Sequence, residues 1–552
     1  MRRRRLTCLL AALSCTALAV PAAQAKAPDR PSGRPNFLII VADDLGFSDI
    51  GAFGGEIDTP NLDALAMSGM RLTGFHTEAA CAPTRSMLLT GSDSHRVGLG
   101  NMPESMASNQ VGKPNYEGYL RPDTATVAER LSAAGYRTLF SGKWHLGVAP
   151  QQDPHARGFQ HSFVMLNCCH NHFGLGLSTD SAKMSSYRRD GVIVSSLPAD
   201  FYSSDYFAAM LVDELRASRA GPGGKKPFFA YLAFTAPHAP LQAPHETIAK
   251  YMGRYDTGYD VLREQRLRRQ RELGLLDPSV QPHHPVDTVA WASLSPEAKA
   301  ASARKMEIYA AMVDRLDQGV GQVIAELKAS GEYDNTVIVF LSDNGAEARD
   351  PAPKTGTLAP PLETLGTANS YVNYGAGWAL AATAPSWRFK TFATEGGLHT
   401  PAFVTGPAVS QKGAINRAYT NVRDVVPTVL DIAQVPVTPG RFAGRTVQPI
   451  DGLSWTKLLA DDSPVYPADK AVGTELFGSR SLRQGDWKIT DISDGPWHLF
   501  NLASDPGETR DLSAQEPARK AALIAAWDSY AKDVGVVLPD PPSHPNPPRD
   551  HD

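Results

Sequence analysis

Two pairs of polar residues, far apart in the chain, offer oxygen atoms that could hold a cation. Asp43 and Asp44 are adjacent, and Asp343 and Asn344 form a second adjacent pair. Carboxylate and amide oxygens are the ligands of hard cations such as Ca²⁺ and Mg²⁺, whereas zinc prefers histidine and cysteine. Aspartates also occur in turns for backbone reasons, so each pair alone is weak evidence. Together the two pairs predict a site for Ca²⁺ or Mg²⁺.

Cys81 is the next residue whose chemistry needs an explanation. The sequence has five cysteines, and two of them, Cys8 and Cys15, lie in a segment that we expect to be removed. Cys168 and Cys169 are adjacent and could form a vicinal disulfide or remain as two thiols. Cys81 then has no evident partner, which in an exported protein indicates either an ordinary buried thiol or a reactive one.

The segment that we expect to be removed is an export signal. Residues 2–5 are arginines, residues 6–20 are apolar, and residues 23–25 (AQA) form a small-residue cleavage site before Lys26. The apolar run is shorter than a membrane span. These features predict a signal peptide at 1–25, no stable membrane span, and a periplasmic or secreted protein, with the Sec and twin-arginine routes both open.

Four expected strands run directly into polar residues. Apolar runs at 37–42, 138–140, 228–234 and 337–341 are followed by residues 43–44 (DD), 142–147 (GKWHLG), 237–238 (PH) and 343–345 (DNG). Ligand sites in open parallel sheets lie at the carboxyl ends of the strands. We therefore expect Lys143, His145 and His238 to share one pocket with the two acidic pairs.

Helical patterns alternate with these strands and predict helices on both faces of a mostly parallel sheet. The expected helices are 59–69, 124–134, 206–217, 303–330 and 421–433, and a further strand is expected at 401–405. Residues 350–390 are rich in Pro, Gly, Ala and Thr and predict a long loop. After residue 440, short pieces at 487–490 and 497–502 and a helical pattern at 516–534 predict a small antiparallel sheet with one helix.

Residues 81–85 (CAPTR), which continue to Thr90 and Gly91, resemble the signature of the sulfatase family. In that family, a cysteine followed by a proline and an arginine is oxidised to formylglycine. Helical residues after Pro83 would place residue 81 near a helix N-terminus, where backbone N–H groups favour an anionic ester.

Further motifs extend the resemblance over roughly residues 35–405. They are residues 35–36 (PN), 43–46 (DDLG), 135–138 (GYRT), 142–147 (GKWHLG), 236–238 (APH) and 342–345 (SDNG), together with Lys390 and residues 395–397 (EGG). Residues 487–512 are similar to the family's C-terminal subdomain, and 255–266 and 370–378 are similar to its bacterial arylsulfatase branch. The chain departs from this pattern at His399, where relatives often carry arginine, and at 167–170 (NCCH), where that branch is glycine-rich. We expect both departures at the pocket rim, where they bear on substrate choice.

The resemblance implies an α/β fold of the alkaline-phosphatase type. We expect a mostly parallel sheet flanked by helices, with a smaller C-terminal α+β subdomain that contains an antiparallel sheet. The predicted divisions are a signal peptide at 1–25, a linker at 26–34, a catalytic domain at 35–440, a C-terminal subdomain at 441–538 and a disordered tail at 539–552. The resemblance also selects one Ca²⁺ per chain, bound by Asp43, Asp44, Asp343, Asn344 and the modified side chain of Cys81.

The resemblance further implies roles for the basic residues. Arg85, Lys143 and Lys390 are placed around the sulfuryl oxygens, where fixed cations stabilise developing charge. His238 and Lys390 are candidates for protonating the leaving alcohol. The hydrated aldehyde at residue 81 offers one hydroxyl that attacks sulfur and a second that His145 deprotonates to expel sulfate. A serine could accept the sulfuryl group but could not eliminate it.

The charge of the chain argues against nucleic acid as a partner. Removing residues 1–25 takes away four arginines and no acids, so 54 basic and 58 acidic residues become 50 and 58, a net charge of about −8. A nucleic-acid binder needs a net basic face. A run of arginines at 263–271 alternates with acids and leucines, which predicts a solvated amphipathic helix.

These observations predict an enzyme that hydrolyses sulfate esters, with aryl sulfates as its substrates. Its partners would be a small-molecule sulfate ester and the maturation enzyme that generates formylglycine. Two alternatives stay open: a phosphonate monoester or phosphodiester hydrolase on the same scaffold, and an inactive calcium-stabilised protein that binds carbohydrate. The intact set of Cys81, Arg85, His145 and His238 argues against the inactive binder, because a binder needs no nucleophile.

Overall fold

A computed structural model describes residues 33–183, 185–221, 223–349, 361–493 and 495–541. The expected signal peptide, most of the expected linker, residues 350–360 of the expected loop and residues 542–552 of the expected tail lie outside the described residues. Over the described ranges, none of the helices combines the length and the apolar character that crossing a membrane requires.

The central element is a ten-stranded sheet with the order β11-β2-β10-β9-β1-β8-β4-β5-β6-β7. The run from β9 through β1, β8 and β4 to β5 is parallel, and antiparallel strands β10 and β6 flank it. All residues of β1, β8 and β9 are buried, so both faces of these strands are covered. This burial explains why they are continuous apolar runs rather than alternating patterns.

The strands are β1 (Asn36–Ala42), β2 (Met70–Leu72), β3 (Phe75–His76), β4 (Arg137–Lys143), β5 (His161–Met165), β6 (Tyr187–Arg189), β7 (Val192–Ile193), β8 (Phe228–Ala233), β9 (Thr336–Ser342), β10 (Ala402–Thr405), β11 (Ala414–Asn416), β12 (Thr420–Asn421), β13 (Arg441–Phe442), β14 (Arg445–Thr446), β15 (Ala471–Leu476), β16 (Ser479–Gln484), β17 (Trp487–Asp491) and β18 (His498–Asn501). The helices are α1 (Pro60–Ser68), α2 (Cys81–Thr90), α3 (Val127–Ala133), α4 (Ser203–Ala220), α5 (His245–Lys250), α6 (Gly258–Glu272), α7 (Pro296–Ala329), α8 (Ala376–Thr383), α9 (Glu395–Leu398), α10 (Val425–Ile432), α11 (Thr456–Asp461) and α12 (Pro517–Val534).

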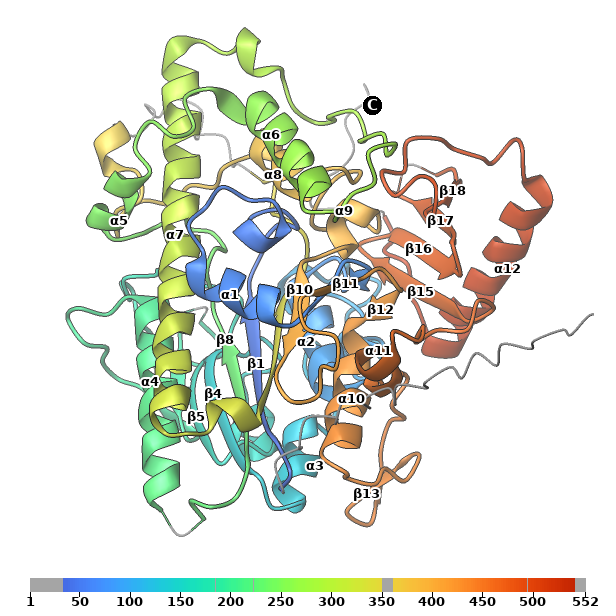
Figure 1. Ribbon diagram of the computed structural model, residues 1–552. Helices are drawn as coiled ribbons and strands as arrows, with labels where there is room; N and C mark the ends of the chain where they lie inside the picture. The colour runs from blue at the N-terminus through green and yellow to red at the C-terminus, as the bar shows by residue number, and fades with distance from the viewer. Residues whose placement is uncertain (1–32, 184, 222, 350–360, 494, 542–552) are drawn as a thin grey trace, which may run out of the picture. The chain divides into compact units, whose positions relative to one another are not determined.

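Two apolar cores lie on the two faces of the sheet. Alternate residues of β1 enter different cores, because successive side chains of a strand point to opposite faces. Leu38 and Ile40 join the core formed with α1, α4 and α7, whereas Phe37 and Ile39 join the core formed with α2, α3 and α10. Figure 1 shows α4 and α7 on one side of the sheet and α2 and α10 on the other.

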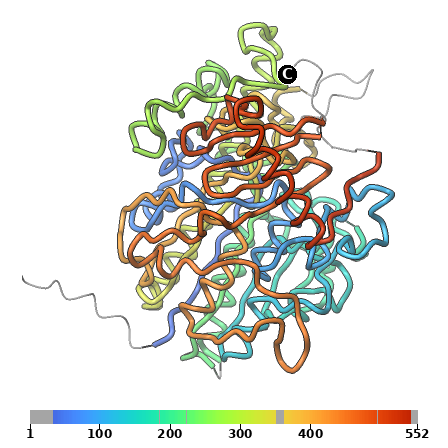
Figure 2. The backbone as a smooth tube through the Cα atoms, turned by 90° about the vertical axis from the view of Figure 1, so that its right-hand side faces the viewer, coloured from blue at the N-terminus to red at the C-terminus, as the bar shows by residue number. Residues whose placement is uncertain are grey.

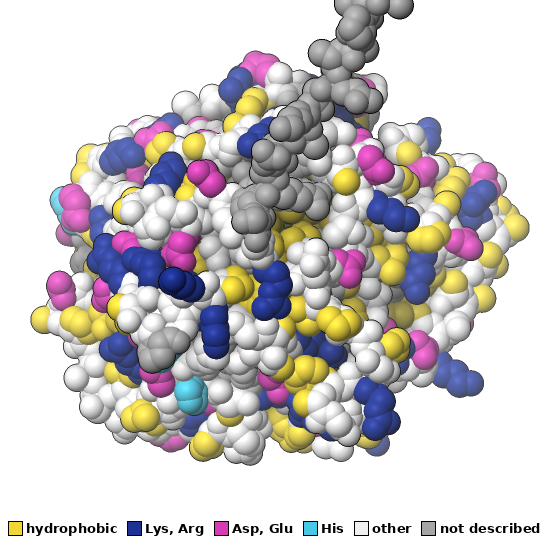
Figure 3. Space-filling view, turned by 60° about the horizontal axis from the view of Figure 1, so that its bottom comes forward, with side chains coloured by type: hydrophobic (Ala, Val, Ile, Leu, Met, Phe, Trp, Pro, Cys, Tyr) yellow, Lys and Arg dark blue, Asp and Glu magenta, His cyan; other side chains and the backbone are white. Residues whose placement is uncertain are grey.

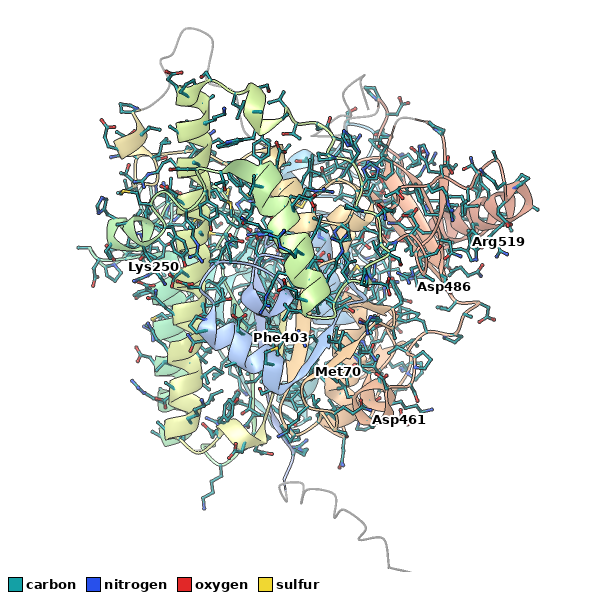
Figure 4. The ribbon with its side chains drawn as sticks, turned by 45° about the horizontal axis from the view of Figure 1, so that its top comes forward. Met70, Lys250, Phe403, Asp461, Asp486 and Arg519 are labelled. Atoms are coloured by element: carbon teal, nitrogen blue, oxygen red, sulfur yellow. The ribbon has the colours of Figure 1, made fainter. Side chains whose placement is uncertain are left out.

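Beyond β9 the sheet continues through β10, which pairs antiparallel with both β9 and β2, and β11 forms the edge. Val404 of β10 pairs with Met70 of β2, and Phe403 pairs with Arg71. Met70 and Phe403, labelled in Figure 4, are both fully buried and belong to different cores. The sheet therefore continues beyond its parallel part without exposing its apolar side chains.

A separate four-stranded antiparallel sheet follows near the C-terminus, in the order β15-β16-β17-β18. Helix α12 packs on this sheet through Leu523 and Trp527, which contact Leu482, Ile489 and Leu499. Figure 2 shows these segments, in orange and red, lying next to one another. The predicted fold class, a mostly parallel α/β sheet with a smaller antiparallel sheet, is confirmed. The predicted domain boundaries stay predictions.

Two local predictions are wrong in part. The arginine run at 263–271 lies on α6, but Arg266 is buried rather than solvated. Its guanidinium forms ion pairs with Asp49 at 2.6 Å and Glu56 at 2.8 Å, and the pattern of the helix alone cannot reveal such distant partners. Elsewhere on the surface, basic and acidic side chains are intermixed, as the face in Figure 3 shows.

The second error concerns residues 350–390, which are not all loop. Helix α8 (Ala376–Thr383) forms there, and every one of its residues from Gly377 to Thr383 is buried. A helix buried all round carries no amphipathic period, so the pattern that identifies surface helices is missing.

Candidate active site

Neighbouring strand ends bring the two acidic pairs together. Parallel strands β1 and β9 pair Ala42 with Ser342, so the residues that follow them emerge side by side. The backbone N–H of Asp44 donates to Asp343 Oδ1 at 3.3 Å. Asp43, Asp44, Asp343 and Asn344 are all fully buried. The expected convergence of strand ends is therefore present in the structure.

Cys81 is the first residue of α2 and lies against the acidic pairs. Its Sγ is 3.4 Å from Asp43 Oδ1, and the side chain is completely buried. The first N–H groups of an α-helix have no acceptor within the helix and carry partial positive charge. The start of α2 therefore favours an anionic group bound to residue 81.

Three buried cations surround the same carboxylates. Arg85, one turn after Cys81, donates from Nε to Asp343 Oδ2 at 2.8 Å. Lys143 Nζ lies 2.7 Å from Asp43 Oδ2, and Lys390 Nζ lies 2.7 Å from Asp44 Oδ1. Three cations thus balance three carboxylates, so an added divalent cation would make the pocket attractive to an anionic ester.

The donor set fits a hard cation. Asn344 donates through its Nδ2 to Asp44 Oδ1 at 2.6 Å, while its Oδ1 is buried and has no hydrogen-bond partner. A buried acceptor without a partner is rare in proteins and needs an explanation. Asn344 Oδ1, together with the oxygens of Asp43, Asp44 and Asp343, would supply ligands for such an ion.

The carboxyls respond differently to this environment. Burial would raise the pKa of Asp44, but Lys390 and His238 outweigh it and hold that pKa well below its usual range. Burial and the charge of Asp43 raise the pKa of Asp343. Burial, Asp343 and Asp43 raise the pKa of the Cys81 thiol well above its ordinary value. An unmodified Cys81 would thus be a thiol, which is a poor nucleophile.

His238 faces Asp44 from the end of β8. Its Nδ1 donates to the carbonyl of Ala239 at 2.6 Å, and its Nε2 lies 3.6 Å from Asp44 Oδ2. Burial, together with the positive charges of Lys390 and Lys143, lowers the pKa of His238 to about 4 against the pull of Asp44. One ring nitrogen of His238 and one ligand atom each of Asp43, Asp44 and Cys81 lie within 4.8 Å of one another.

His145 follows β4 and is held in a left-handed backbone conformation, with φ of 61°. Its Nε2 lies 3.3 Å from Glu104 Oε2, while its Nδ1 is buried without a partner. Because the pKa of Glu104 is lowered to about 2 by His145 against burial, the carboxylate accepts and Nε2 carries the proton. Burial lowers the pKa of His145, so its Nδ1 has a free lone pair and can act as a base.

Glycines in the motifs allow the strand ends to approach closely. A Cβ at Gly142, where φ is 125°, would lie 1.8 Å from the carbonyl oxygen of Ala233 on β8. A Cβ at Gly345 would lie 2.0 Å from the carbonyl oxygen of Gly396. Any side chain at these positions would separate elements that carry Lys143, Asn344 and Lys390.

The structure joins the predicted site residues and adds others. Cys81, Arg85, Lys143, His238, Lys390 and the four metal-ligand candidates are linked by the contacts above, and His145 follows Lys143 by two residues. Sequence reasoning missed Glu104, which orients His145, and Glu347, whose Oε2 is 3.6 Å from Lys390 Nζ. Glu347 follows the 342–345 motif closely, which could have marked it, whereas nothing near Glu104 in the sequence indicates a partner.

The two expected rim positions differ in what they contact. His399 hydrogen-bonds the carbonyl of Thr73 at 2.7 Å and stacks on Phe47 and His76. Cys168 instead lies close to Glu104 and His145. The rim expectation for both segments stays a prediction.

Comparison with known proteins decides the family. The model of the Sulfatase family matches residues 35–435. The chain belongs to the sulfatase family. This sulfatase is 45% identical over 531 residues to an uncharacterised sulfatase of Schizosaccharomyces pombe, with 92% of this chain and 95% of the relative covered. It is 39% identical over 438 residues to an arylsulfatase of Klebsiella aerogenes, with 77% and 92% covered.

Solved structures agree on the fold of this sulfatase. The crystal structure of Ps i-CgsB has a TM-score of 0.67 and 24% identity, and the comparison covers 90% of this chain and 93% of that one. The family prediction made from the motifs is confirmed. The family indicates hydrolysis of sulfuric esters and generally uses a metal ion and formylglycine, and the buried cluster of acids and Cys81 is compatible with both.

Proposed function

We propose that this protein is an exported arylsulfatase that uses formylglycine made from Cys81 and one bound Ca²⁺. The observation that carries the proposal is the position of Cys81, buried at the start of α2 and 3.4 Å from Asp43. A 39% identical relative named arylsulfatase supports the aryl substrate. The proposed place of action is the periplasm or the exterior, with a signal peptide at 1–25 and a catalytic domain at 35–440.

The cation would be held by Asp43, Asp44, Asp343 and Asn344, with the modified residue 81 completing the set. When bound, it would lower the pKa of a coordinated hydroxyl and neutralise charge on the ester. The four unmodified residues offer only oxygen atoms as ligands, and this favours Ca²⁺ over zinc. The partnerless Oδ1 of Asn344 supports this assignment.

The hydrated aldehyde at residue 81 would supply one hydroxyl to attack sulfur and a second to be deprotonated when sulfate leaves. Arg85, Lys143 and Lys390 would contact the sulfuryl oxygens, since all three ammonium or guanidinium groups lie around the carboxylates next to Cys81. Fixed and buried cations stabilise the charge that develops on those oxygens.

His145 would take the proton from the second hydroxyl. Its Nε2–H is held by Glu104, so the lone pair stays on Nδ1, and burial keeps the ring neutral. A carboxylate behind the imidazole also stabilises the imidazolium that forms. His145 would therefore act as the base, and Glu104 would orient it.

His238 and Lys390 would protonate the leaving oxygen. Lys390 is charged in the free protein, because Asp44 outweighs burial and holds its pKa well above the ordinary value. His238 is neutral in the free protein, and an anionic ester next to its Nε2 would raise its affinity for a proton. Both side chains flank Asp44, on the same part of the pocket.

The experiment that tests this function is the mass of the peptide that contains residue 81, from protein made in its own host. We expect the mass of formylglycine in at least part of the protein, and loss of turnover with an intact fold in Cys81→Ala. Fully active enzyme with only unmodified cysteine would contradict the proposal. Turnover of aryl sulfates should be compared with that of phosphate diesters and phosphonate monoesters, because faster phosphoryl cleavage would favour the alternative hydrolase.

A further inference from the structure

A second cluster of metal-binding side chains lies next to the base His145. Glu104, His145 and Cys168 each place one ligand atom within 4.8 Å of the others. This set combines a carboxylate, an imidazole and a thiol. The four ligands proposed for calcium, residues 43, 44, 343 and 344, offer only oxygen atoms. Zinc and similar borderline-soft cations prefer nitrogen and sulfur ligands and often bind three protein groups plus water.

The register of the central sheet explains why these residues meet. Parallel strands β4 and β5 pair Lys143 with Met165, and the pairing continues beyond their ends. The N–H of His145 donates to the carbonyl of Leu166 at 3.0 Å. Cys168 therefore follows two residues after the contact that holds His145, which makes its proximity a consequence of the fold.

The side chains are suited to receive a cation from solvent. His145 is buried, and its Nε2 lies 3.3 Å from Glu104 Oε2, so these two groups already face each other. The Glu104 side chain is 39% exposed and lines a surface pocket of about 790 Å³, so this member of the cluster is reached from solvent. Cys168 is a free thiol whose Sγ lies 3.1 Å from that of Cys169, so a second sulfur is within reach.

Some charges near the cluster favour the binding of a cation, and one opposes it. Lys143 is close enough to act on Cys168 and opposes a second cation. Binding of the ion would release the Cys168 thiol proton to solvent, so Glu104 and the resulting thiolate would carry two negative charges, which balance those of a divalent ion. The pair of ligand charges therefore offsets the repulsion from Lys143.

We propose that Glu104, His145 and Cys168 form a binding site for a borderline-soft divalent cation such as Zn²⁺, separate from the oxygen-rich site at Asp43. An ion bound between Glu104 and His145 would replace the proton on His145 Nε2, and the neutral ring would then carry its proton on Nδ1. If the proposed function holds, the ion would then inhibit the enzyme reversibly by removing its base.

The test uses the full chain in its calcium-loaded form, with thiols reduced and the reductant removed. Cd²⁺ and Zn²⁺ are the probes, because cadmium–thiolate bonds absorb in the ultraviolet and zinc affinity can be measured by competition with a coloured chelator. We expect one equivalent of Cd²⁺ to produce thiolate absorption in the wild type. Cys168→Ser should abolish that absorption and weaken zinc binding by about 100-fold or more.

Two controls make the result specific. Cys169→Ser keeps Cys168 and should retain most of the zinc affinity, and His161→Ala removes an exposed histidine that lies 3.5 Å from Asp190 with no thiol near it in the described contacts. If Cys168→Ser is poorly folded by circular dichroism, Cys168→Ala replaces it. Zinc affinity unchanged in the folded Cys168 variant, or absence of cadmium–thiolate absorption in the wild type, would overturn the site.

Activity separates this inference from the proposed function. Zn²⁺ should inhibit aryl sulfate hydrolysis by the wild type at least about 10-fold more strongly than by Cys168→Ser. Equal inhibition of both proteins would contradict the site while leaving the proposed function intact. Zinc binding that depends on Cys168 in a protein without sulfatase activity would support the site and contradict the function.

Discussion

Replacing Lys488 with methionine should destabilise the protein strongly, because this residue joins the small C-terminal sheet to the active-site region. Lys488 Nζ lies 2.8 Å from Glu395 Oε1 and 2.8 Å from Glu508 Oε1, and all three side chains are buried. Removing one partner from a buried ion pair typically costs about 3–5 kcal/mol, since it leaves a buried charge uncompensated. Here two carboxylates would lose their cation, so we expect the upper part of that range.

The loss should depend on pH in a definite direction. Burial raises the pKa of Glu508 to about 7, against the opposing charge of Lys488. A carboxyl whose pKa is higher in the folded than in the unfolded state binds more protons when folded, so stability falls as pH rises through that range. Without Lys488 the pKa rises further. The destabilisation should therefore grow between pH 6 and pH 8, by at most about 1.4 kcal/mol per pH unit.

The assay is urea denaturation followed by intrinsic fluorescence at pH 6 and pH 8. Arg519→Met is the matched control, because Arg519 (Figure 4) lies on α12, the helix that packs on the same small sheet. Its side chain is 45% exposed, and its Nε lies 3.7 Å from Glu516 Oε2. The control should lose less than about 1 kcal/mol. A loss below 1 kcal/mol for Lys488→Met at both pH values, or a larger loss at pH 6 than at pH 8, would refute the reasoning.

Activity should fall as well, because the same contacts hold the segment that carries Lys390. The N–H of Ala393 donates to Ser479 Oγ at 2.8 Å, and Thr490 Oγ1 donates to the carbonyl of Ala393 at 3.2 Å. The N–H of Glu395 donates to Glu508 Oε2 at 2.8 Å. The small sheet and Glu508 therefore hold residues 393–395, which follow Lys390 in the chain.

The remaining predictions concern the site and one buried arginine. His238→Ala should lower kcat/KM for aryl sulfates with poor leaving groups by about 10²–10⁴ but spare nitrophenyl sulfate. His145→Ala should slow turnover of all substrates and give a burst of phenol. An identical dependence on the leaving group in both variants would contradict these roles. Asp343→Ala should lose both activity and the one calcium per chain expected by elemental analysis, and activity that only zinc restores would exclude calcium. Because burial lowers the pKa of His145 below 6.5 and this base acts after the phenol has left, kcat should fall only as pH drops below that value, and an acid limb of kcat above pH 6.5 would argue against His145 as the base. Arg266→Leu should cost about 3–5 kcal/mol in urea denaturation, since it leaves Asp49 buried without its cation, and a near-neutral effect would show that the pair is not needed.

Strongly patterned segments were predictable from the sequence. The parallel strands are continuous apolar runs with polar residues directly after them, and both features survive in β1, β8 and β9. The strand expected at 138–140 is longer, because β4 continues to Lys143. At Gly142 only glycine allows the close pairing with β8. Strands β15 and β16 were missed, since their alternation is weak and their pairing is with each other and with β17.

Residue types and spacing in the chain were enough to predict the family, which the family model confirms. They also led to an oxygen-rich ligand set and an unusual role for Cys81, which stay predictions. Each motif is local, because neighbouring residues stay together wherever the fold places them. The meeting of the pair after β1 with the pair after β9 is not local, because it depends on the pairing of these two strands. Partnerships between distant segments depended on tertiary structure: Glu104 with His145, Arg266 with Asp49, and Lys488 with Glu395. The reason is physical, since a buried charge must find a partner across the core and sequence spacing does not encode which segment the sheet register brings to it.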